Sequence, residues 1–555
     1  MAELTRDAVL RLLADRLVAK LDWQITDPAR PDHGGIVLPE WGIAYAGGVT
    51  GWLAGCALVW LGGGADEATR RALLARAFPA AEYLLRMQRP SGLIDLPDCN
   101  YDSGPDTGFA VQLLCAALEV ERNMPSDDPQ WRELAGLLTR FARRAVGGML
   151  EGGFHTPNHR WVVASALAQA GALWPDLPVE PTIAAYLAEG IDIDAEGAYI
   201  ERSVGVYDAV CDRSLQLIAE HRASDAPALD AAVRANLDLD LHLLHADGSA
   251  ETGLSHRQDY GTRVVPTTLV APLLHSALRD PDPRFVRAAR WLWQQGTPSL
   301  PDCVWLAYVL LAHGEPAPGD VGPPEDFARH YPHNGLWRAR RGALSVTAFR
   351  GVSRLLSLRH GAAELSGVSI HQSYFSQASG RFIGDELAGE GERAILRSLG
   401  QADPRRPGYE QPLGRPVPPE RWVELLQERQ VSRLPPAASE LALSLAPGGL
   451  DLRYRTLDGM PGVVAQVAFP SLPAASGRPT TLACARSPGR PSSSKAWPRH
   501  DARFDSDTIR LGPGNDAHRT WQMRHTGPPA GHVRVLVPFF RMVDHAFAVR
   551  VGQGV

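Results

Sequence analysis

Helical periodicity over the first 310 or so residues is the feature that most constrains the fold. Apolar residues recur at helical spacing in segment after segment, and short breaks rich in Gly, Pro and Asp separate the segments. Because no fixed-length repeat relates them, we expect helix pairs closed into an α/α toroid rather than an open solenoid. Its loops would surround a central cleft, where we expect the chemistry. Twelve helices are predicted, at 3–22, 42–62, 66–88, 106–122, 129–146, 157–173, 181–189, 204–222, 227–245, 265–278, 283–296 and 302–313.

The pattern changes at "GEPAPGDVGPPEDF", residues 314–327, which is proline-rich and typical of a linker between domains. Beyond it come short alternating runs such as "GALSVTAFRG" and "HVRVLVPFF", punctuated by turn residues, which predict an antiparallel β-sandwich. The expected fold is therefore a multidomain α+β protein. A toroidal catalytic domain spans 1–313, a linker 314–333 and a β-sandwich 334–555.

Composition excludes several classes of partner. The 555 residues are 45% hydrophobic and 21% charged with a net charge of −6, so the chain offers no bulk attraction to nucleic acid or to anionic membranes. It has no apolar window long enough for a membrane span and no secretory signal, so we expect a cytoplasmic protein. The six cysteines are widely spaced and predict buried free thiols. A homo-oligomer is compatible with the sequence.

The stretch "FHTPNHRW", residues 154–161, is the first candidate site. Thr156 and Pro157 predict a helix start, with a hydroxyl N-cap followed by proline at the first helical position. Free backbone N–H groups and the positive end of the helix dipole favour an anion there. Four side chains in this first turn are potential donors: His155, Asn158, His159 and Arg160.

The loop "DLPDCNYDSGPDTGF", residues 95–109, is the second candidate. Asp106 and Thr107 open a helix, and Asn100 and Tyr101 lie in the loop before it. Asp106 alone is best explained as a helix cap. For the whole segment, a capped turn and a sugar-contacting loop are equally supported.

Two further polar segments follow. In "DAEGAYIERSVGVYDAVCDRSLQ", residues 194–216, Tyr207 lies near a helix start, where a tyrosine taken by itself is usually a packing residue. A triplet precedes it: Glu201, Arg202 and Ser203. The segment "ETGLSHRQDYGTR", residues 251–263, is either a binding loop or an ordinary charged surface loop. It contains His256, Arg257, Gln258, Asp259 and Arg263.

No metal or cofactor site is predicted. The segment "NLDLDLHLLHADG" is rich in Asp and His, but on a helix Asp238 and Asp240 point in different directions. Its leucines instead predict a helix with one buried side. No nucleotide-binding or zinc-protease motif occurs in a sequence context that would support it, so the sequence does not favour those functions.

The order of these parts resembles the heparinase II/III-like polysaccharide lyases, a group that includes oligoalginate lyases. The likeness rests on a helical toroid, an Asn-His pair opening a middle helix ("TPNHRW"), a tyrosine some fifty positions later ("ERSVGVYD"), and a β-sandwich with further histidines. It covers most of the chain. The resemblance implies a carbon–oxygen lyase that cleaves uronic acid-containing glycans by β-elimination and leaves an unsaturated uronate end.

Carried across residue by residue, the resemblance implies that Asn158 and His159 neutralise the substrate carboxylate or move protons. It also makes Tyr207 the proton-transfer residue. A catalytic histidine from the sandwich would be His371 in "GVSIHQSYF" or His360 in "LRHGAAE". The Gly-His-Gly-His run of many relatives is absent, which removes residues for a structural zinc site.

The chemistry requires a base for the C5 proton and an acid for the departing C4 oxygen. A free tyrosine has a pKa near ~10, so a base at Tyr207 needs a cationic or donor neighbour. Candidates are Arg202, His159 and Arg257. We expect an acidic oligosaccharide as the substrate.

Two other functions remain open. An (α/α) toroid glycoside hydrolase acting on uronyl oligosaccharides would use two carboxylates from Asp102, Asp106, Asp194 and Asp259. A non-catalytic carbohydrate-binding protein would use the same surface without turnover.

Overall fold

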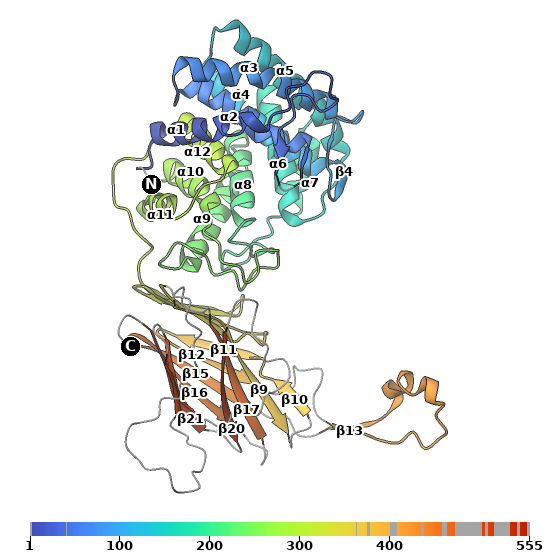
Figure 1. Cartoon of the computed structure of the whole chain (residues 1–555), viewed down its shortest axis with the longest axis vertical. Helices are drawn as coiled ribbons and strands as arrows, with labels where there is room; N and C mark the ends of the chain where they lie inside the picture. Colours follow the sequence, from blue (N-terminus) through green and yellow to red (C-terminus); the bar gives the residue numbers. More distant parts are fainter. Residues whose placement is uncertain are drawn as a thin grey trace. The chain divides into compact units, whose positions relative to one another are not determined.

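The computed structural model places helices and strands in separate parts of the chain (Figure 1). It describes residues 3–39, 41–361, 363–374, 378–399, 408–433, 438–457, 463–471, 502–505, 509–514, 533–540 and 544–551. Two compact units result: Met1–Leu244 with Gly248–Pro324, and His245–Asp247 with Glu325–Val555. The predicted order, a helical N-terminal region followed by antiparallel sheets, is confirmed.

Each of the twelve predicted helices is present among the described residues, with ends that differ from the prediction by up to about five residues. Their bounds are α1 (Arg6–Val18), α2 (Ala46–Gly62), α3 (Glu67–Met87), α4 (Gly104–Asn123), α5 (Pro129–Glu151), α6 (Pro157–Leu173), α7 (Glu180–Ala188), α8 (Asp208–His221), α9 (Ala226–Leu243), α10 (Val270–Arg279), α11 (Pro283–Gln295) and α12 (Leu300–His313). Short strands β1 (Val37–Leu38), β2 (Ile43–Ala44), β3 (Ile94–Leu96) and β4 (Asn100–Ser103) lie between them. None of the helices in the described part is long and apolar enough to cross a membrane.

The even-numbered helices form a closed ring of contacts. In order, α2 packs on α4, α4 on α6, α6 on α8, α8 on α10 and α10 on α12, and α12 packs on α2 again. The odd-numbered helices pack against them, for example α1 on α2 and α12, and α9 on α8. Because α2, α4 and α6 are buried around most of their circumference, they occupy inner positions.

The second unit consists of antiparallel strands: β5 (Phe327–Tyr331), β6 (Leu336–Arg341), β7 (Leu344–Phe349), β8 (Leu356–His360), β9 (Ala363–Tyr374), β10 (Ala378–Arg381), β11 (Glu386–Glu390), β12 (Arg393–Ser398), β13 (Gly408–Glu410), β14 (Val431–Arg433), β15 (Ser439–Ala446), β16 (Gly449–Thr456), β17 (Val463–Ser471), β18 (Ala502–Asp505), β19 (Ile509–Gly514), β20 (Val533–Phe540) and β21 (Asp544–Val551). One sheet has the order β20-β17-β9-β8-β7-β6-β5, with β10 beside β9, and the other has β11-β12-β15-β16-β21-β19-β18. Strand β5 lies inside the range expected to be a linker.

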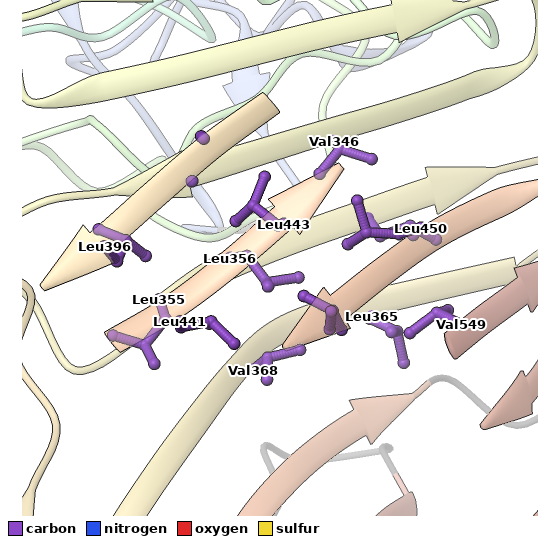
Figure 2. Packing of buried hydrophobic residues seen from close by; sticks show 14 of the residues in the cluster. Val346, Leu355, Leu356, Leu365, Val368, Leu396, Leu441, Leu443, Leu450 and Val549 are labelled. Atoms are coloured by element: carbon purple, nitrogen blue, oxygen red, sulfur yellow. The ribbon is translucent and has the colours of Figure 1, made fainter. Parts of the chain in front are cut away.

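Both large sheets contribute to one hydrophobic core (Figure 2). Leu356 and Leu365 come from the first sheet, and Leu443 and Leu450 come from the second. Burial alternates along β12, as expected for a strand with one face on a core. The two sheets therefore face each other across a shared layer of side chains.

The described cysteines agree with the expected free thiols in all but one respect. Cys56, Cys115, Cys211 and Cys303 are free and buried, whereas Cys99 is free but exposed. Cys484 lies outside the described residues.

Candidate active site

The sequence-predicted polar residues gather at the N-terminal ends of the inner helices. Asp106 is in the first turn of α4, Asn158 and His159 open α6, and Tyr207 immediately precedes α8. Because these helices pack side by side in the ring, their first turns lie close together. Three segments that are far apart in the sequence therefore meet at one end of the helical unit.

Asn158 binds an anion at the start of α6, but the anion is the protein's own Glu201. The side-chain Nδ2 of Asn158 donates to Glu201 Oε2 at 2.7 Å and to Thr156 Oγ1 at 3.0 Å, and its backbone N–H donates to Glu201 Oε2 at 3.3 Å. Thr156 occupies the N-cap position without the predicted side-chain cap. Asn158 is fully buried with both amide hydrogens in use. This arrangement therefore does not support the expected direct contact with a substrate carboxylate.

Glu201 connects Asn158 to Tyr207 through an arginine. Arg257 Nη1 donates to Glu201 Oε1, and the guanidinium carbon lies 4.4 Å from the centre of the Tyr207 ring. Gln258 Nε2 donates to the Tyr207 hydroxyl at 2.7 Å. Tyr207 is half-buried, so it is not a residue of the dry core. Its hydroxyl has a donor neighbour and its ring a cationic one.

His159 is held as a neutral imidazole. Burial lowers the pKa of His159 to about 4, and the nearby Asp106 carboxylate offsets this only in part, while His155 and Arg257 lower it further. The ring meets Phe109 edge-on at 6.2 Å between centroids, and its Nδ1 atom is buried without a hydrogen-bond partner among the described residues. At neutral pH, His159 therefore offers a lone pair and an N–H rather than a positive charge.

The loop that carries Arg257 and Gln258 is tied to the segment before Tyr207 by Asp259. This carboxylate accepts from Ser203 Oγ at 2.9 Å, from the Gly205 backbone N–H at 3.1 Å and from Ser255 Oγ. A Cβ atom at Gly205 would lie 2.7 Å from Asp259 Oδ2, so the close approach requires glycine. Asp259 is buried and serves the loop structure.

Arg202 adopts a strained backbone conformation beside Glu201. Its φ of +51° is in the left-handed region, which costs a non-glycine residue about 1–3 kcal/mol. Its half-buried guanidinium makes no hydrogen bond or ion pair with any residue that the structure describes. Asp102, in the second candidate segment, has the same φ of +51°. Strain of this kind clusters at functional sites.

The second candidate segment forms the β3–β4 hairpin and the first turn of α4. Asp106 accepts from Asn100 Nδ2 at 2.9 Å and from Ser103 Oγ at 2.6 Å. Tyr101 is 75% exposed, and the Arg89 guanidinium lies 4.2 Å from the centre of its ring. The N-cap of α4 is Ser103, so the expectation that Asp106 is a helix cap is wrong; Asp106 lies in the first turn, and its charge reaches His159.

Arg160 does not belong to this group. It is 7% exposed, and its terminal nitrogens donate to Glu189 at 3.0 Å and to Asp192 at 2.9 Å. Arg160 therefore forms structural ion pairs. This corrects the prediction that Arg160 contacts the substrate. The residue lies one helix position away from His159, where its side chain takes a different direction.

Of the remaining predicted residues, His256 and His155 lie at the exposed edge of this group, and His360 and His371 belong to the second unit. His256 is exposed, with Nδ1 3.1 Å from the Ile200 carbonyl oxygen, and His155 is exposed 6.2 Å from the His159 ring. His360 ends β8 of the second unit. His371 is in β9, and its side chain lies outside the described residues.

Sequence reasoning missed an aromatic pair before α2. Burial, together with the charges of Asp106 and Asp98, raises the pKa of Tyr45, which places this phenol beside the α4 end of the group. The Trp41 ring lies 5.2 Å from that of Tyr45. Gly47 and Gly48 lie under the Tyr45 ring, where a Cβ atom at either would come within 2.9 Å. The sequence "YAGG", a tyrosine followed closely by two glycines, could have indicated this close packing around Tyr45.

Comparison with known proteins supports the fold. No family model and no curated protein matches the sequence. The structure is similar to a chondroitin AC lyase of Streptomyces coelicolor A3 in complex with chondroitin sulphate, with a TM-score of 0.53 and 11% identity over 99% of this chain and 80% of that one. It is also similar to heparinase III, with a TM-score of 0.51 and 10% identity over 99% and 85% of the two chains.

Proposed function

We propose that this protein is a lyase that cleaves uronate-containing oligosaccharides by β-elimination. We further interpret the closed helix ring as an (α/α) toroid and the two facing sheets as a β-sandwich. One observation carries the functional proposal: the Tyr207 hydroxyl is held by Gln258 while Arg257 covers its ring. Of the two similar structures, one is described as a lyase in complex with chondroitin sulphate and the other as heparinase III, which agrees with an acidic substrate.

Tyr207 is the proton-transfer residue in this proposal. Gln258 holds the hydroxyl oxygen in place, and the Arg257 guanidinium lies over the ring, where it can stabilise negative charge that develops on the phenol during the reaction. The phenolate takes the C5 proton of the uronate, the C–H electron pair forms the C4–C5 double bond, and the C4–O bond breaks. The departing oxygen leaves with the electrons of that bond and receives the proton back from Tyr207. The balance requires no oxidant and no water.

The substrate carboxylate needs a positive partner, because the C5 proton is only weakly acidic beside a negative charge. Arg202 supplies it in our proposal. Its guanidinium is uncommitted among the described residues, and its strained backbone directly follows Glu201. Asn158 then acts as a positioning residue, since it holds the Glu201 carboxylate that orients Arg257.

His159 contributes hydrogen bonds to the sugar rather than acid catalysis. Its pKa of about 4 means that almost no imidazolium exists at neutral pH to protonate a leaving group. The aromatic ring of Phe109 beside His159 and the ring of Tyr45, which feels the charge of Asp106, offer apolar surface to a sugar ring.

The test is a panel of uronic acid oligosaccharides followed by ultraviolet absorbance and mass spectrometry. We expect an unsaturated product from the wild type and a loss of at least about 100-fold in rate for Tyr207→Phe, since a positioned proton-transfer group contributes about 10²–10⁴-fold. Tyr409→Phe, at an exposed tyrosine of the second unit, is the control and should retain full activity.

Two outcomes would contradict the proposal. Incorporation of solvent oxygen into a product without a double bond would identify a hydrolase. Two of the four aspartates proposed for such a hydrolase, however, already stabilise loops. Asp259 is buried, and Asp194 accepts the backbone N–H groups of Glu196 at 2.9 Å and Ala198 at 3.1 Å. Glycan binding that Tyr207→Phe leaves unchanged, with no product from any substrate, would identify a binding protein.

A further inference from the structure

The opposite end of the helix ring contains a buried cluster of carboxylates and imidazoles that the proposed reaction does not use. Glu119 is in the last turns of α4, Glu220 and His221 end α8, and His313 ends α12. His275 joins them from α10. About twelve residues of α8 separate Tyr207 from Glu220, which corresponds to about 18 Å along the helix. The cluster is therefore distinct from the candidate active site.

The cluster is compact. His275 Nε2 lies 2.6 Å from Glu220 Oε1, and His313 Nε2 lies 3.0 Å from the same oxygen. His221 Nε2 lies 2.8 Å from Glu119 Oε1. The ligand atoms of Glu220, His275 and His313 lie within 4.8 Å of one another, as do those of Glu119, Glu220 and His221.

All five atoms are shielded from solvent, and among the residues that the structure describes they contact one another as nitrogen–carboxylate pairs rather than through other hydrogen-bond partners. His275 is only 2% exposed, so bulk solvent does not reach its ring nitrogen. The ligand atoms of Glu220, His275 and His313 therefore converge on a common point. A buried polar atom without a partner is costly, so a cation at that point would remove the cost.

The charge balance also favours a cation. Glu119 Oε2 and Glu220 Oε2 each lie 2.9 Å from the Tyr308 hydroxyl, whose single proton can be donated to only one of them. In addition, α4, α8 and α12 all end near this cluster, and the C-terminal ends of helices carry partial negative charge. Two buried carboxylates therefore lie in a field that attracts positive charge.

The geometry points to a binding site for one divalent transition-metal ion of the Zn²⁺ type, with Glu220 Oε1, His275 Nε2 and His313 Nε2 as ligands. Two imidazoles and one carboxylate are a ligand set that zinc accepts. Ligand atoms on a tetrahedral zinc lie roughly 3.4 Å apart, given bonds of about 2.1 Å, so entry of the ion requires these side chains to separate by less than about 1 Å. Tyr308, Glu119 and His221 surround the ligands and orient them.

The ion would link three helices of the ring. Its ligands come from α8, α10 and α12, and α12 is the helix that closes the ring against α2. Its role is thus to stabilise the closed ring, because binding to the folded state alone raises stability. It takes no part in proton transfer at Tyr207.

The experiment is a Zn²⁺ titration of the full-length chain after treatment with a chelator. We expect the wild type to bind one equivalent and to gain thermal stability. Glu220→Gln and His313→Gln should weaken Zn²⁺ binding by more than about 100-fold, and Tyr308→Phe by about 10- to 100-fold, as for a residue that orients a ligand. His242→Gln is the matched control, since His242 is another buried histidine near a carboxylate, 3.9 Å from Asp238, and should bind as the wild type does.

A second measurement, on the wild-type chain alone, tests the metal site even if a variant fails to fold. Co²⁺ added to the wild-type chain should give the intense visible absorption of a tetrahedral site, and Zn²⁺ should displace it. The absence of stoichiometric uptake of either metal by the wild type would overturn the inference, as would Glu220→Gln and His313→Gln chains that bind Zn²⁺ as tightly as the wild type. These readouts are independent of glycan cleavage, so the two proposals succeed or fail separately.

Discussion

At the scale of single residues, Glu201 is the centre of the candidate active site. One of its oxygens accepts from Asn158 and the other from Arg257, so a single carboxylate sets the position of the cation over Tyr207. In the sequence, Glu201 was only one member of a triplet before Tyr207, because nothing in its local pattern shows that its partners lie 43 positions before it and 56 after it.

Glu201→Gln should therefore reduce turnover more than it reduces substrate affinity. The neutral amide no longer holds the Arg257 guanidinium over the Tyr207 ring, and we expect the free energy of unfolding to fall by roughly 1–3 kcal/mol as a partly buried ion pair is broken. Steady-state kinetics and urea unfolding measure the two effects. Glu133→Gln, on the exposed side of α5, should change neither. Unchanged kcat in Glu201→Gln would show that Arg257 is positioned by other groups.

His159 predicts a defined effect of pH on stability. Burial lowers its pKa to about 4, whereas the unfolded chain has a histidine pKa of about 6.5. Between these values the unfolded state binds a proton that the folded state does not, so stability is lost as the pH falls from about 6.5 to about 4. Replacing His159 with Gln should flatten the pH dependence of the free energy of unfolding in that window. A slope identical to that of the wild type would contradict the buried, neutral imidazole.

At the scale of elements, the twelve helices were predictable because their periodicity is local, and so was the placement of the Asn-His pair at the start of α6. The contacts between elements were not predictable. Arg160 was expected beside a substrate and instead pairs with Glu189 and Asp192 across about 30 positions. Glu220, His275 and His313 share no spacing that indicates a site, and only the packing of α8, α10 and α12 unites them.

The junction between the segment before α8 and the loop at 251–263 provides a prediction at this scale. Gly205→Ala would place a Cβ atom 2.7 Å from Asp259 Oδ2 and 2.8 Å from Val264 Cγ1, so these segments must separate. We expect a loss of about 1–3 kcal/mol in the free energy of unfolding and a clear fall in activity, because Arg257 and Gln258 are carried by the displaced loop.

Gly136→Ala is the matched substitution for this test. Its added Cβ atom meets nothing within 4 Å, and it lies within helix α5. Alanine should stabilise that helix by up to about 1 kcal/mol and leave activity unchanged. Should Gly205→Ala behave like Gly136→Ala, the tight contact with Asp259 would have no functional importance.

At the scale of the whole molecule, the helical unit separates two kinds of chemistry. The N-terminal ends of α4, α6 and α8 carry the candidate active site, and the C-terminal ends of α4, α8 and α12 carry the buried carboxylate–imidazole cluster. This follows from the parallel arrangement of the inner helices, whose dipoles favour anions at one end and cations at the other. The second unit is built differently, on a core shared by two antiparallel sheets.

Closure of the ring also affects how the chain can be made. Helix α12 packs on both α1 and α2, so these two helices lack their final neighbour until residue 313 has been synthesised. Until then the part of α2 that α12 covers, which includes Gly62 beside Leu311, has nothing from α12 to cover it. A nascent chain of this protein should therefore depend on chaperones for most of its translation, and its early helices should become resistant to protease only after α12 has emerged.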